Sequence, residues 1–535
     1  QFPNDPQFNI SDSLNSAFQG TPDKMFMRVS LNNPGVYSAG MVVEKDAGEQ
    51  WWAKTSPTGV DYLSAYVFFD KVNRHIKSLA IGDYRMRIGQ GLILDNSFIS
   101  SSFLDLGFFA KSPEFLKPYH SLQENKMLRG VAMNLDLGQH NTANIFYSKS
   151  RIDANLNESN LEVSDPNLIF LSSIQSSGYH RTKSEIEDRN SLGVSYRGIT
   201  FKHDYANAYL GCGLVNSYQD VVPTSDLAPY QLFLPQIRNQ WHGTIFHQLN
   251  YKGVLVFGEF AGDQKLNLAA MEGLLKGLGK YADIAIVYRN FSPSFQSSLS
   301  QVFSANGKSQ NEKGVLIGFN FFINKECRIN LSWNSWQHPW LKYRVDLPSH
   351  AQEFSARFSF IRKRKWTTYL QYIHRIKEQN TPTDQVNILE NLNNESIRLH
   401  AEVKINSDWT WRARAEYHGF MDSKNHESGY LIYQDLLFKS IEERTSGNLR
   451  FGFYQTDSYN TRIYTFENDM LYQFRIPAYF GTGAIGYLNI RTRINNSLSA
   501  EARFSIQYSG YKNQLPIHEN SYNKEIKLQI HYSFN

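Results

Sequence analysis

The C-terminal stretch Leu498-Ser499-Ala500-Glu501-Ala502-Arg503-Phe504-Ser505-Ile506-Gln507-Tyr508 alternates apolar with polar side chains. A period of two predicts a β-strand that has one apolar face and one polar face. The same alternation returns in residues 526–535 and on both arms of a hairpin, residues 397–417, that turns at Asn406-Ser407-Asp408. The polar face of this hairpin carries Arg, His, Glu and Lys, so it either meets solvent from a soluble sandwich or lines a water-filled lumen.

The length of the strands and the asymmetry of the turns decide between these two folds. The alternating runs extend over about 10 to 12 residues, as tilted membrane-spanning strands require, whereas strands of soluble proteins cluster near ~5 to 6. Short turns are expected at residues 324–326, 362–365, 406–408 and 494–497, and longer polar connections at residues 339–349, 379–394, 421–428 and 510–524. Every short turn falls on the side where the chain ends, which is typical of a barrel with short periplasmic turns and longer external loops.

The composition of the 535-residue chain excludes a bundle of membrane-spanning helices but not a membrane barrel. The mean hydropathy is -0.46, and no apolar run approaches the ~18 residues that such a helix needs. In a barrel, lipid-facing and lumen-facing residues alternate, so each strand averages out as half polar. At ~22 to 26 residues per strand and connection, the sequence predicts an all-β fold: a large transmembrane outer-membrane β-barrel of about 20 to 24 antiparallel strands with plug or lid insertions.

The expected domain organisation is an N-terminal periplasmic or lumenal segment, residues 1–23, followed by the transmembrane barrel, residues 24–535. Two stretches, near residues 95–123 and 157–190, lack sustained alternation and are long enough to form a plug inside the lumen or an external lid. Within the second, Ser184 and Glu187 have the spacing of a capping box, which predicts a short helix with Ser184 as its N-cap.

The chain offers no signature of catalysis, metal binding or polyanion binding. Its 55 Lys and Arg against 50 Asp and Glu give a net charge of +5 that is spread along the chain rather than gathered into a basic block. Cys212 and Cys327 match no metal or redox spacing. Neither a Gly-x-Ser-x-Gly elbow nor a His-Glu-x-x-His motif occurs. We therefore expect no catalytic residue, no metal and no cofactor.

The stretch Gly82-Asp83-Tyr84-Arg85-Met86-Arg87-Ile88-Gly89-Gln90-Gly91-Leu92 has a separate interest. Asp83, Arg85 and Arg87 share one strand face, and Gly89 and Gly91 allow the backbone to turn or to approach a neighbour closely. A phosphate cradle would need a following Lys-Ser/Thr and a helix, and neither follows. The alternatives that stay open are a salt-bridge cluster inside the barrel and a constriction for conduction or binding.

These residues belong to a set of motifs that resembles a known family. The motifs are Val43 to Glu49, Ile81 to Leu94, Gln123-Glu124-Asn125, Arg129 to Ala132, Gly178 to Thr182 with Glu185, Gly258 to Ala261, Tyr288 to Ser292, and Asn311-Glu312. Over residues 20–318 the chain is similar to the barrel region of the helix-hairpin-helix-containing outer-membrane proteins of Bacteroidetes. Residues 1–21 are too short to contain the helix-hairpin-helix module itself, so a role in DNA contact is not expected for this chain alone.

The resemblance and the pattern of charges together nominate residues that line the lumen or a constriction. They are Asp83, Arg85, Arg87, Gln90, Glu124, Arg129, His180, Arg181, Glu185, Arg289 and Glu312. The resemblance assigns none of them a catalytic role.

The function that the sequence favours is a non-enzymatic β-barrel of the bacterial outer membrane, acting as a channel or as a subunit of an envelope transport or export complex. The expected partners are outer-membrane lipid and lipopolysaccharide, with other outer-membrane or periplasmic proteins. Two alternatives stay open. The first is a DNA-uptake or DNA-contact component, suggested only by the resemblance, and the second is an outer-membrane hydrolase.

Overall fold

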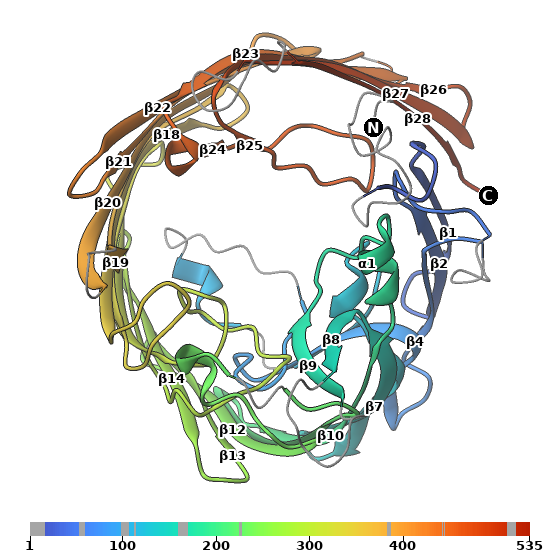
Figure 1. The fold of residues 1–535 in the computed structure, drawn as a ribbon, viewed down its shortest axis with the longest axis vertical. Coiled ribbons are helices and arrows are strands. Elements are labelled where there is room, and N and C mark those ends of the chain that lie inside the picture. Colours follow the sequence, from blue (N-terminus) through green and yellow to red (C-terminus); the bar gives the residue numbers. More distant parts are fainter. Residues whose placement is uncertain are drawn as a thin grey trace.

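A single large β-sheet curls around a lumen and makes up most of the chain (Figure 1). The computed structural model describes residues 17–52, 59–97, 106–111, 114–158, 169–223, 227–381, 387–440, 442, 444–510 and 521–534. Among these residues the sheet has 24 strands. The predicted fold class and strand number are confirmed.

Consecutive strands of the wall pair antiparallel with one another. The wall strands are β1 (Met25–Asn33), β2 (Tyr37–Lys45), β3 (Tyr62–Asp70), β4 (Ile76–Ile88), β6 (Leu128–Gly138), β7 (Asn141–Ile152), β10 (Leu192–Asp204), β11 (Ala208–Gln219), β12 (Asn239–Tyr251), β13 (Val254–Asp263), β14 (Leu268–Leu278), β15 (Ala282–Phe291), β16 (Glu312–Phe322), β17 (Cys327–His338), β18 (Ser349–Arg362), β19 (Trp366–Thr381), β20 (Ile388–Lys404), β21 (Trp409–Met421), β22 (His426–Lys439), β23 (Thr445–Thr456), β26 (Thr482–Arg493), β27 (Leu498–Gly510) and β28 (Ser521–Tyr532). The twenty-fourth strand, β5 (Glu114–Pro118), pairs with the C-terminal part of β4.

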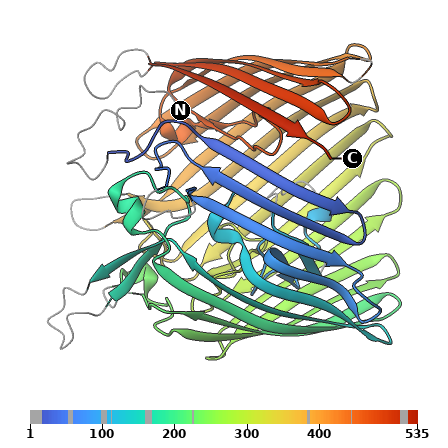
Figure 2. The same cartoon turned by 90° about the vertical axis from the view of Figure 1, so that its right-hand side faces the viewer.

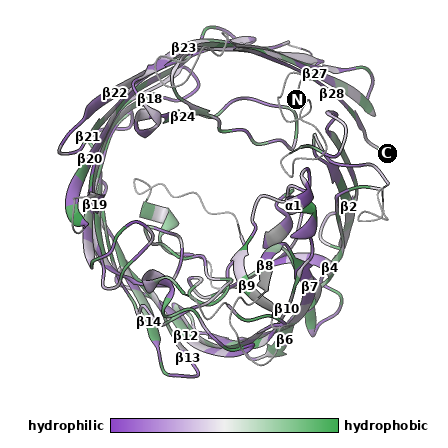
Figure 3. Cartoon of the chain, in the orientation of Figure 1, coloured by the Kyte–Doolittle hydropathy of each residue, from purple (hydrophilic) through white to green (hydrophobic). Residues whose placement is uncertain are grey.

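Alternation along the wall strands places apolar side chains outside and polar or charged ones inside. On β22 and β23, Ile432 and Leu449 are 58% and 49% exposed, whereas Asp435 and Arg450, which face inward, are buried. Figure 3 shows hydrophilic and hydrophobic residues alternating along the wall. None of the described helices is long and apolar enough to cross a membrane. An apolar outer face, as on β22 and β23, is what contact with lipid requires of a barrel.

The short connections gather at one end of the barrel and the longer ones at the other (Figure 2). Hydrogen bonds join neighbouring segments at the short-turn end. The Lys404 N–H donates to Lys365 O at 2.7 Å, and the Ser533 N–H donates to Ser497 O at 2.7 Å. The second of these bonds places the end of the described chain at the short-turn end, as the sequence predicts. The four short turns expected from the sequence all lie there, between the strands that they were expected to join.

Two of the expected long connections are wrong. Strands β19 and β20 pair as far as Thr381 and Ile388, so most of residues 379–394 is strand, and residues 382–386 lie outside the described part. The connection between β21 and β22 is only residues 422–425. Backbone pairing continues there although the alternation is lost, because strand ends that project beyond the bilayer need no apolar face.

Smaller elements project from the long-connection side and into the lumen. They are the hairpin of β8 (Ala154–Glu158) and β9 (Ile169–Ile174), the short pair β24 (Ile463–Tyr464) and β25 (Ala478–Tyr479), the helix α1 (Lys183–Glu187), and the 3-10 turns η2 (Leu106–Phe108), η3 (Glu124–Lys126), η4 (Pro229–Gln231) and η5 (Tyr459–Thr461). Of the two stretches expected to form a plug or lid, residues 98–105, 112–113 and 159–168 lie outside the described residues.

The helix expected near Ser184 forms, but its N-cap is Thr182 and its capping box is completed by Glu185. The sequence contains both spacings, Thr182 to Glu185 and Ser184 to Glu187. The guanidinium of Arg181 lies 2.9 Å from the Glu185 carboxylate and fixes it at the third helical position, which favours the earlier cap.

Candidate functional site

Two inward segments, residues 85–97 and 292–311, lie against each other inside the barrel. The Gln301 N–H donates to Gly91 O at 3.1 Å, and the Asp95 N–H donates to Leu299 O at 2.9 Å. Together with residues 106–111 we call them the inner body; its turn η2 is drawn inside the ring in Figure 1. Met86, Leu92 and Phe295 of the inner body belong to one buried apolar cluster with wall residues of β12 to β16, including Phe246 and Met271. The inner body is therefore packed against one side of the wall.

Two glycines form the turn through which the inner body meets the wall. Gly89 and Gly91 have φ values of +54° and +94°, in the region that favours glycine. A Cβ at Gly91 would lie 2.5 Å from the backbone oxygen of Gln301. The turn and the close approach expected from the sequence are both present.

Glu259 on β13 fastens this turn to the wall. One carboxylate oxygen accepts the N–H groups of Gln90 at 2.6 Å and Leu92 at 3.1 Å, and the other accepts the Thr244 hydroxyl at 2.8 Å. The Glu259 side chain is fully buried. In the sequence, Glu259 is an acidic residue inside an otherwise apolar strand and lies in the motif Gly258 to Ala261, but it was not among the predicted lumen residues.

A second wall carboxylate holds the other segment of the inner body. Glu312 on β16 accepts the Ala305 N–H at 3.0 Å and receives a hydrogen bond from Arg289 at 2.5 Å. Arg289 also donates to the Asn334 side chain at 3.0 Å. Arg289, Glu312 and Asn334 are each at most 1% exposed, so this network anchors residues 292–311 away from solvent.

The remaining charges of the glycine-rich stretch form salt bridges. Asp95 forms salt bridges with Arg87 at 3.0 Å and with Lys111 at 2.9 Å. Asp95 was not among the residues predicted from the sequence. The Gln90 side chain accepts the Lys111 N–H at 3.0 Å. Asp83 instead faces Arg129, 2.7 Å away. Of the two interpretations left open, these contacts favour the salt-bridge cluster.

Arg85 lies between these two groups on β4. In the strand register it is opposite Lys117 of β5, and its side chain is half-buried.

A histidine surrounded by carboxylates lies near the long-connection end. The Nδ1 of His180 is 2.8 Å from Asp61, and its Nε2 is 3.2 Å from Asp153. Arg189 approaches Asp61 on another side at 3.2 Å. Glu49 accepts the backbone N–H of His180 at 3.0 Å. Glu49, Asp61, Asp153, His180 and the adjacent Glu124 are called the His180 cluster below.

Burial and neighbouring charges set the protonation of this cluster. Burial lowers the pKa of His180, but hydrogen bonds to Asp153 and Asp61 outweigh it and raise that pKa to about 10. Burial, reinforced by the charge of Asp61, raises the pKa of Glu124 to about 9 and that of Glu49 to about 7. An imidazolium between carboxylates thus compensates charges that burial would otherwise penalise.

The donor atoms of the His180 cluster also have the spacing of cation ligands. Glu49, Asp61 and His180 form one such group and Glu124, Asp153 and His180 another, each with donor atoms within 4.8 Å of one another. Because both imidazole nitrogens face carboxylates and Arg189 neutralises Asp61, positive charge is already present. The cluster therefore forms a buried ion network.

Arg181 and Glu185 lie beside this network. The Arg181 guanidinium stacks over Tyr179 at 4.0 Å and Phe18 at 4.9 Å, while its backbone oxygen accepts the Gln19 N–H. The structure thus joins Glu124, His180, Arg181 and Glu185 in one region. Six of the other seven predicted residues form three further groups: Asp83 with Arg129, Arg87 with Gln90, and Arg289 with Glu312. The seventh, Arg85, lies on β4 between the first two groups.

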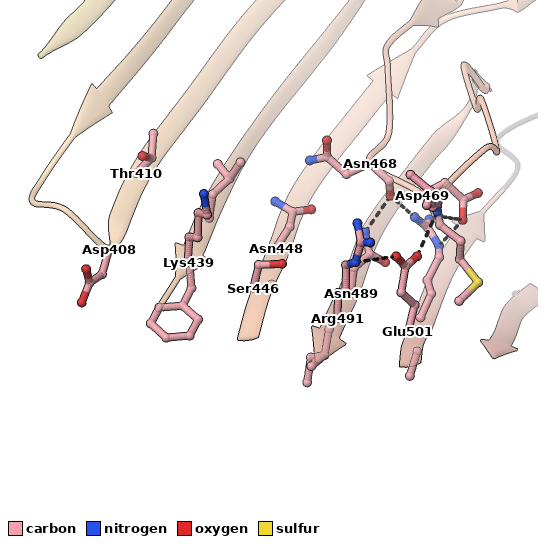
Figure 4. Close-up of a pocket in the computed structure, with 18 of the residues that line it drawn as sticks. Asp408, Thr410, Lys439, Ser446, Asn448, Asn468, Asp469, Asn489, Arg491 and Glu501 are labelled. Carbon is pink, nitrogen blue, oxygen red and sulfur yellow. Dashed lines mark hydrogen bonds and ion pairs between the residues drawn. The ribbon is translucent and has the colours of Figure 1, made fainter. Parts of the chain in front are cut away.

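The opposite half of the wall has its own inward segment. Residues 465–477, between β24 and β25, are called the strap. Arg503 of β27 lies 2.7 Å from Glu467 of the strap, and Lys527 of β28 lies 2.7 Å from its Asp469. Between the strap and β20 to β27 lies a cavity of about 560 Å³. Figure 4 shows Lys439, Arg491 and Glu501 along its wall and Asn468 and Asp469 of the strap beside them.

A second cavity, of about 570 Å³, lies at the short-turn end of the same half. Lys439, Arg444, Arg491 and Arg493 contribute to its lining, and none of the described lining residues is Asp or Glu. Sequence reasoning missed the strap and both cavities because their residues come from several strands and from no local motif.

Comparison with known proteins adds similarity of the barrel alone. No protein-family model matches the chain, and neither does any curated protein. Among solved structures, the ferripyoverdine receptor of the outer membrane of Pseudomonas aeruginosa is 9% identical with a TM-score of 0.45, covering 96% of this chain and 70% of that one. The siderophore receptor PirA from Acinetobacter baumannii is 8% identical (TM-score 0.45; 97% and 81% covered), and the copper transporter OprC is 7% identical (TM-score 0.47; 96% and 83% covered). At TM-scores below 0.5 these similarities support no functional argument.

The class of the protein follows from its own architecture. An antiparallel sheet of this size with an apolar outer belt, an ionic interior, and short turns gathered at one end is a β-barrel of the bacterial outer-membrane type.

Proposed function

We propose that this chain is a non-enzymatic outer-membrane transport barrel whose inner body regulates passage of polar solutes, alone or as a subunit of an envelope export complex. The proposal rests on one observation: the Glu259 carboxylate accepts hydrogen bonds from the backbone N–H groups of Gln90 and Leu92 and so holds the inner body against the wall. Hydrogen bonds from loop backbone N–H groups to a wall carboxylate can be exchanged for bonds to water when the loop moves. An inner body held in this way can block the lumen and can also be released from the wall.

The asymmetry of the lumen supports the same proposal. The inner body packs on β12 to β16, whereas β20 to β27 present charged and amide side chains to two cavities of about 560 and 570 Å³. Ionic side chains that face a lumen stay hydrated at little cost, so this half of the wall suits small polar or charged solutes.

Planar-bilayer conductance of the purified barrel tests the proposal. The Glu259→Ala variant loses the hydrogen bonds that hold Gln90 and Leu92 of the inner body. We therefore expect larger or more frequent openings than in the wild type. Glu259→Gln keeps one acceptor and should have an intermediate effect. The matched control is Glu416→Gln, since among the described residues buried Glu416 forms its ion pair with Arg398 of the neighbouring strand, 2.7 Å away, and not with the inner body.

The outcomes separate the two versions of the proposal. Openings that increase in Glu259→Ala and stay unchanged in Glu416→Gln support regulated passage. If none of the variants conducts, the channel version is wrong. The complex version is then tested by co-purification from native membranes. The resemblance to the Bacteroidetes family stays a prediction.

A further inference from the structure

The first and last strands of the wall are neighbours around the ring but do not pair. Figures 1 and 2 show β1 and β28 side by side. β1 pairs with β2, and β28 pairs with β27. Within the described residues no backbone pairing joins β1 to β28. We call this gap the seam.

Side-chain exposure shows that the β28 edge of the seam is open on its outer face, whereas Met27 and Val29 of β1 are 45% and 44% exposed. Leu528 and Ile530 of β28 are 79% and 77% exposed, whereas Leu449, which has a strand on either side, is 49% exposed. The excess exposure is the area that an adjacent strand covers elsewhere in the wall. The unpaired N–H and C=O groups of such an edge are costly in a bilayer, where no water satisfies them.

The direction of the two strands restricts what can close the seam. Of the 28 strands in the described residues, β5, β8, β9, β24 and β25 are not part of the wall, which leaves 23 wall strands. Because every neighbouring pair is antiparallel and this number is odd, β1 and β28 run in the same direction, as their arrowheads show in Figure 2. One additional strand between them, antiparallel to both, gives an even number and an unbroken antiparallel wall.

The strap ties the two edges together from inside without pairing them. Arg475 of the strap lies 2.6 Å from Glu525 of β28, and Asp469 lies 2.7 Å from Lys527. On the other edge the guanidinium of Arg28 lies 4.3 Å from the ring centre of Tyr472 in the strap. These side-chain contacts keep the edges near each other while their main chains stay available.

Neither the described residues just before β1 nor a second copy of this chain supplies the missing strand. The residues just before β1 turn into the lumen, where the Gln19 N–H donates to Arg181 O and the Gly20 N–H to Gly48 O. A second copy in the same membrane orientation is related by rotation about the membrane normal. That rotation preserves strand direction, so its edges could pair only in parallel.

We propose that the seam binds one β-strand of a separate outer-membrane polypeptide, which runs antiparallel to both β1 and β28. The strand has at least the length of β1, nine residues. It alternates apolar residues facing lipid with polar residues facing the lumen, since both edges do so. The proposal goes beyond regulated passage, because a barrel that does not conduct can still bind a strand.

Site-specific photo-crosslinking in native outer membranes tests the proposal. A benzophenone amino acid replaces Met27 or Leu31 of β1, or Leu528 of β28, and the matched control replaces Leu449. We expect an adduct of one discrete size at all three seam positions and none at Leu449. Mass spectrometry of the adducts should find an alternating segment in which the site joined to Leu31 precedes the site joined to Met27.

Direct closure is tested in a Cys212→Ser, Cys327→Ser background, because both native cysteines are free. Cysteine pairs combine Val29 or Leu31 with Leu528 or Ile530. Rapid disulfide formation in native membranes shows that β1 and β28 pair directly, since strands one place apart bring Cβ atoms within about 5.5 Å. That result overturns the proposal, as do adducts in the reverse order, adducts with this chain's own residues, or no adduct at any seam position.

Discussion

Asp435 of β22 and Arg450 of β23 face each other inside the barrel through two hydrogen bonds, 2.6 and 2.7 Å long. Both side chains are at most 1% exposed, and the Arg450 guanidinium also lies 3.7 Å from the ring centre of Tyr433. These two inward-facing charges are thus matched across neighbouring strands. This matching allows an ionic interior to be partly buried without unpaired charges.

Breaking this pair from one side is predicted to destabilise the barrel strongly. Asp435→Asn leaves Arg450 buried without its counter-charge, and we expect a loss of about 3 to 5 kcal/mol in unfolding free energy. Urea unfolding in detergent measures it. The control is Glu326→Gln, whose exposed pair with Arg362 is expected to contribute at most ~1 kcal/mol. Equal losses in both variants would contradict the burial of the Asp435 pair.

The His180 cluster is predicted to loosen as the pH rises. His180 has its pKa raised from 6.5 to about 10, so its stabilising charge is fully present below pH 6.5 and is lost toward pH 10. Glu124 has its pKa raised from 4.5 to about 9, so the advantage of its neutral form also declines as the pH rises to that value. Hydrogen exchange of residues 178–190, corrected for the intrinsic rate, should accelerate over this range.

The matching variant for the pH prediction is His180→Gln. It removes the titrating imidazole while it keeps a polar side chain of similar length. We expect faster exchange at neutral pH and a weaker dependence on pH than in the wild type. A wild-type cluster that becomes better protected as the pH rises would contradict the raised pKa values of both His180 and Glu124.

Gly91→Ala is predicted to separate the two segments of the inner body. The new Cβ would lie 2.5 Å from the Gln301 backbone oxygen, and the φ of +94° adds strain. The control is Gly279→Ala, which has a φ of +69° but no atom within 4 Å of its Cβ, so it carries only the backbone strain of about 1 to 2 kcal/mol. Faster hydrogen exchange in residues 292–311 should appear in Gly91→Ala alone. Equal effects would mean that the close approach is unimportant.

A charge on the outer face is predicted to be far more harmful than the same charge inside. Leu399 on β20 is 50% exposed on the lipid side, and Leu399→Lys should cost about 2 to 4 kcal/mol near the bilayer midplane. Thr410→Lys places the same side chain in the 560 Å³ cavity and should cost little. Assembly in the outer membrane, followed by heat-modifiable mobility on gels, compares them. Preferential failure of Thr410→Lys would reverse the assigned faces.

Local patterns in the sequence were sufficient for the wall and for parts of the inner body. Alternation at residues 498–508 predicts the two faces of β27, and Gly89 and Gly91 predict a turn with close backbone approach. The helix at residues 183–187 was predicted with the wrong cap, because two overlapping spacings satisfy the same rule. The strand extensions at residues 379–394 were missed, since pairing outside the bilayer leaves no apolar signature.

By itself, the sequence determined that the chain forms a barrel with an apolar outer face and a charged inner face, because period-two alternation is a property of adjacent residues. Only the tertiary structure decided which charges meet. Glu259 reaches Gln90, and His180 reaches Asp61, across more than a hundred residues of chain. It alone also showed that β1 and β28 run in the same direction with an open seam. Contacts of this kind depend on how many strands separate two residues around the ring, and no local periodicity records that number.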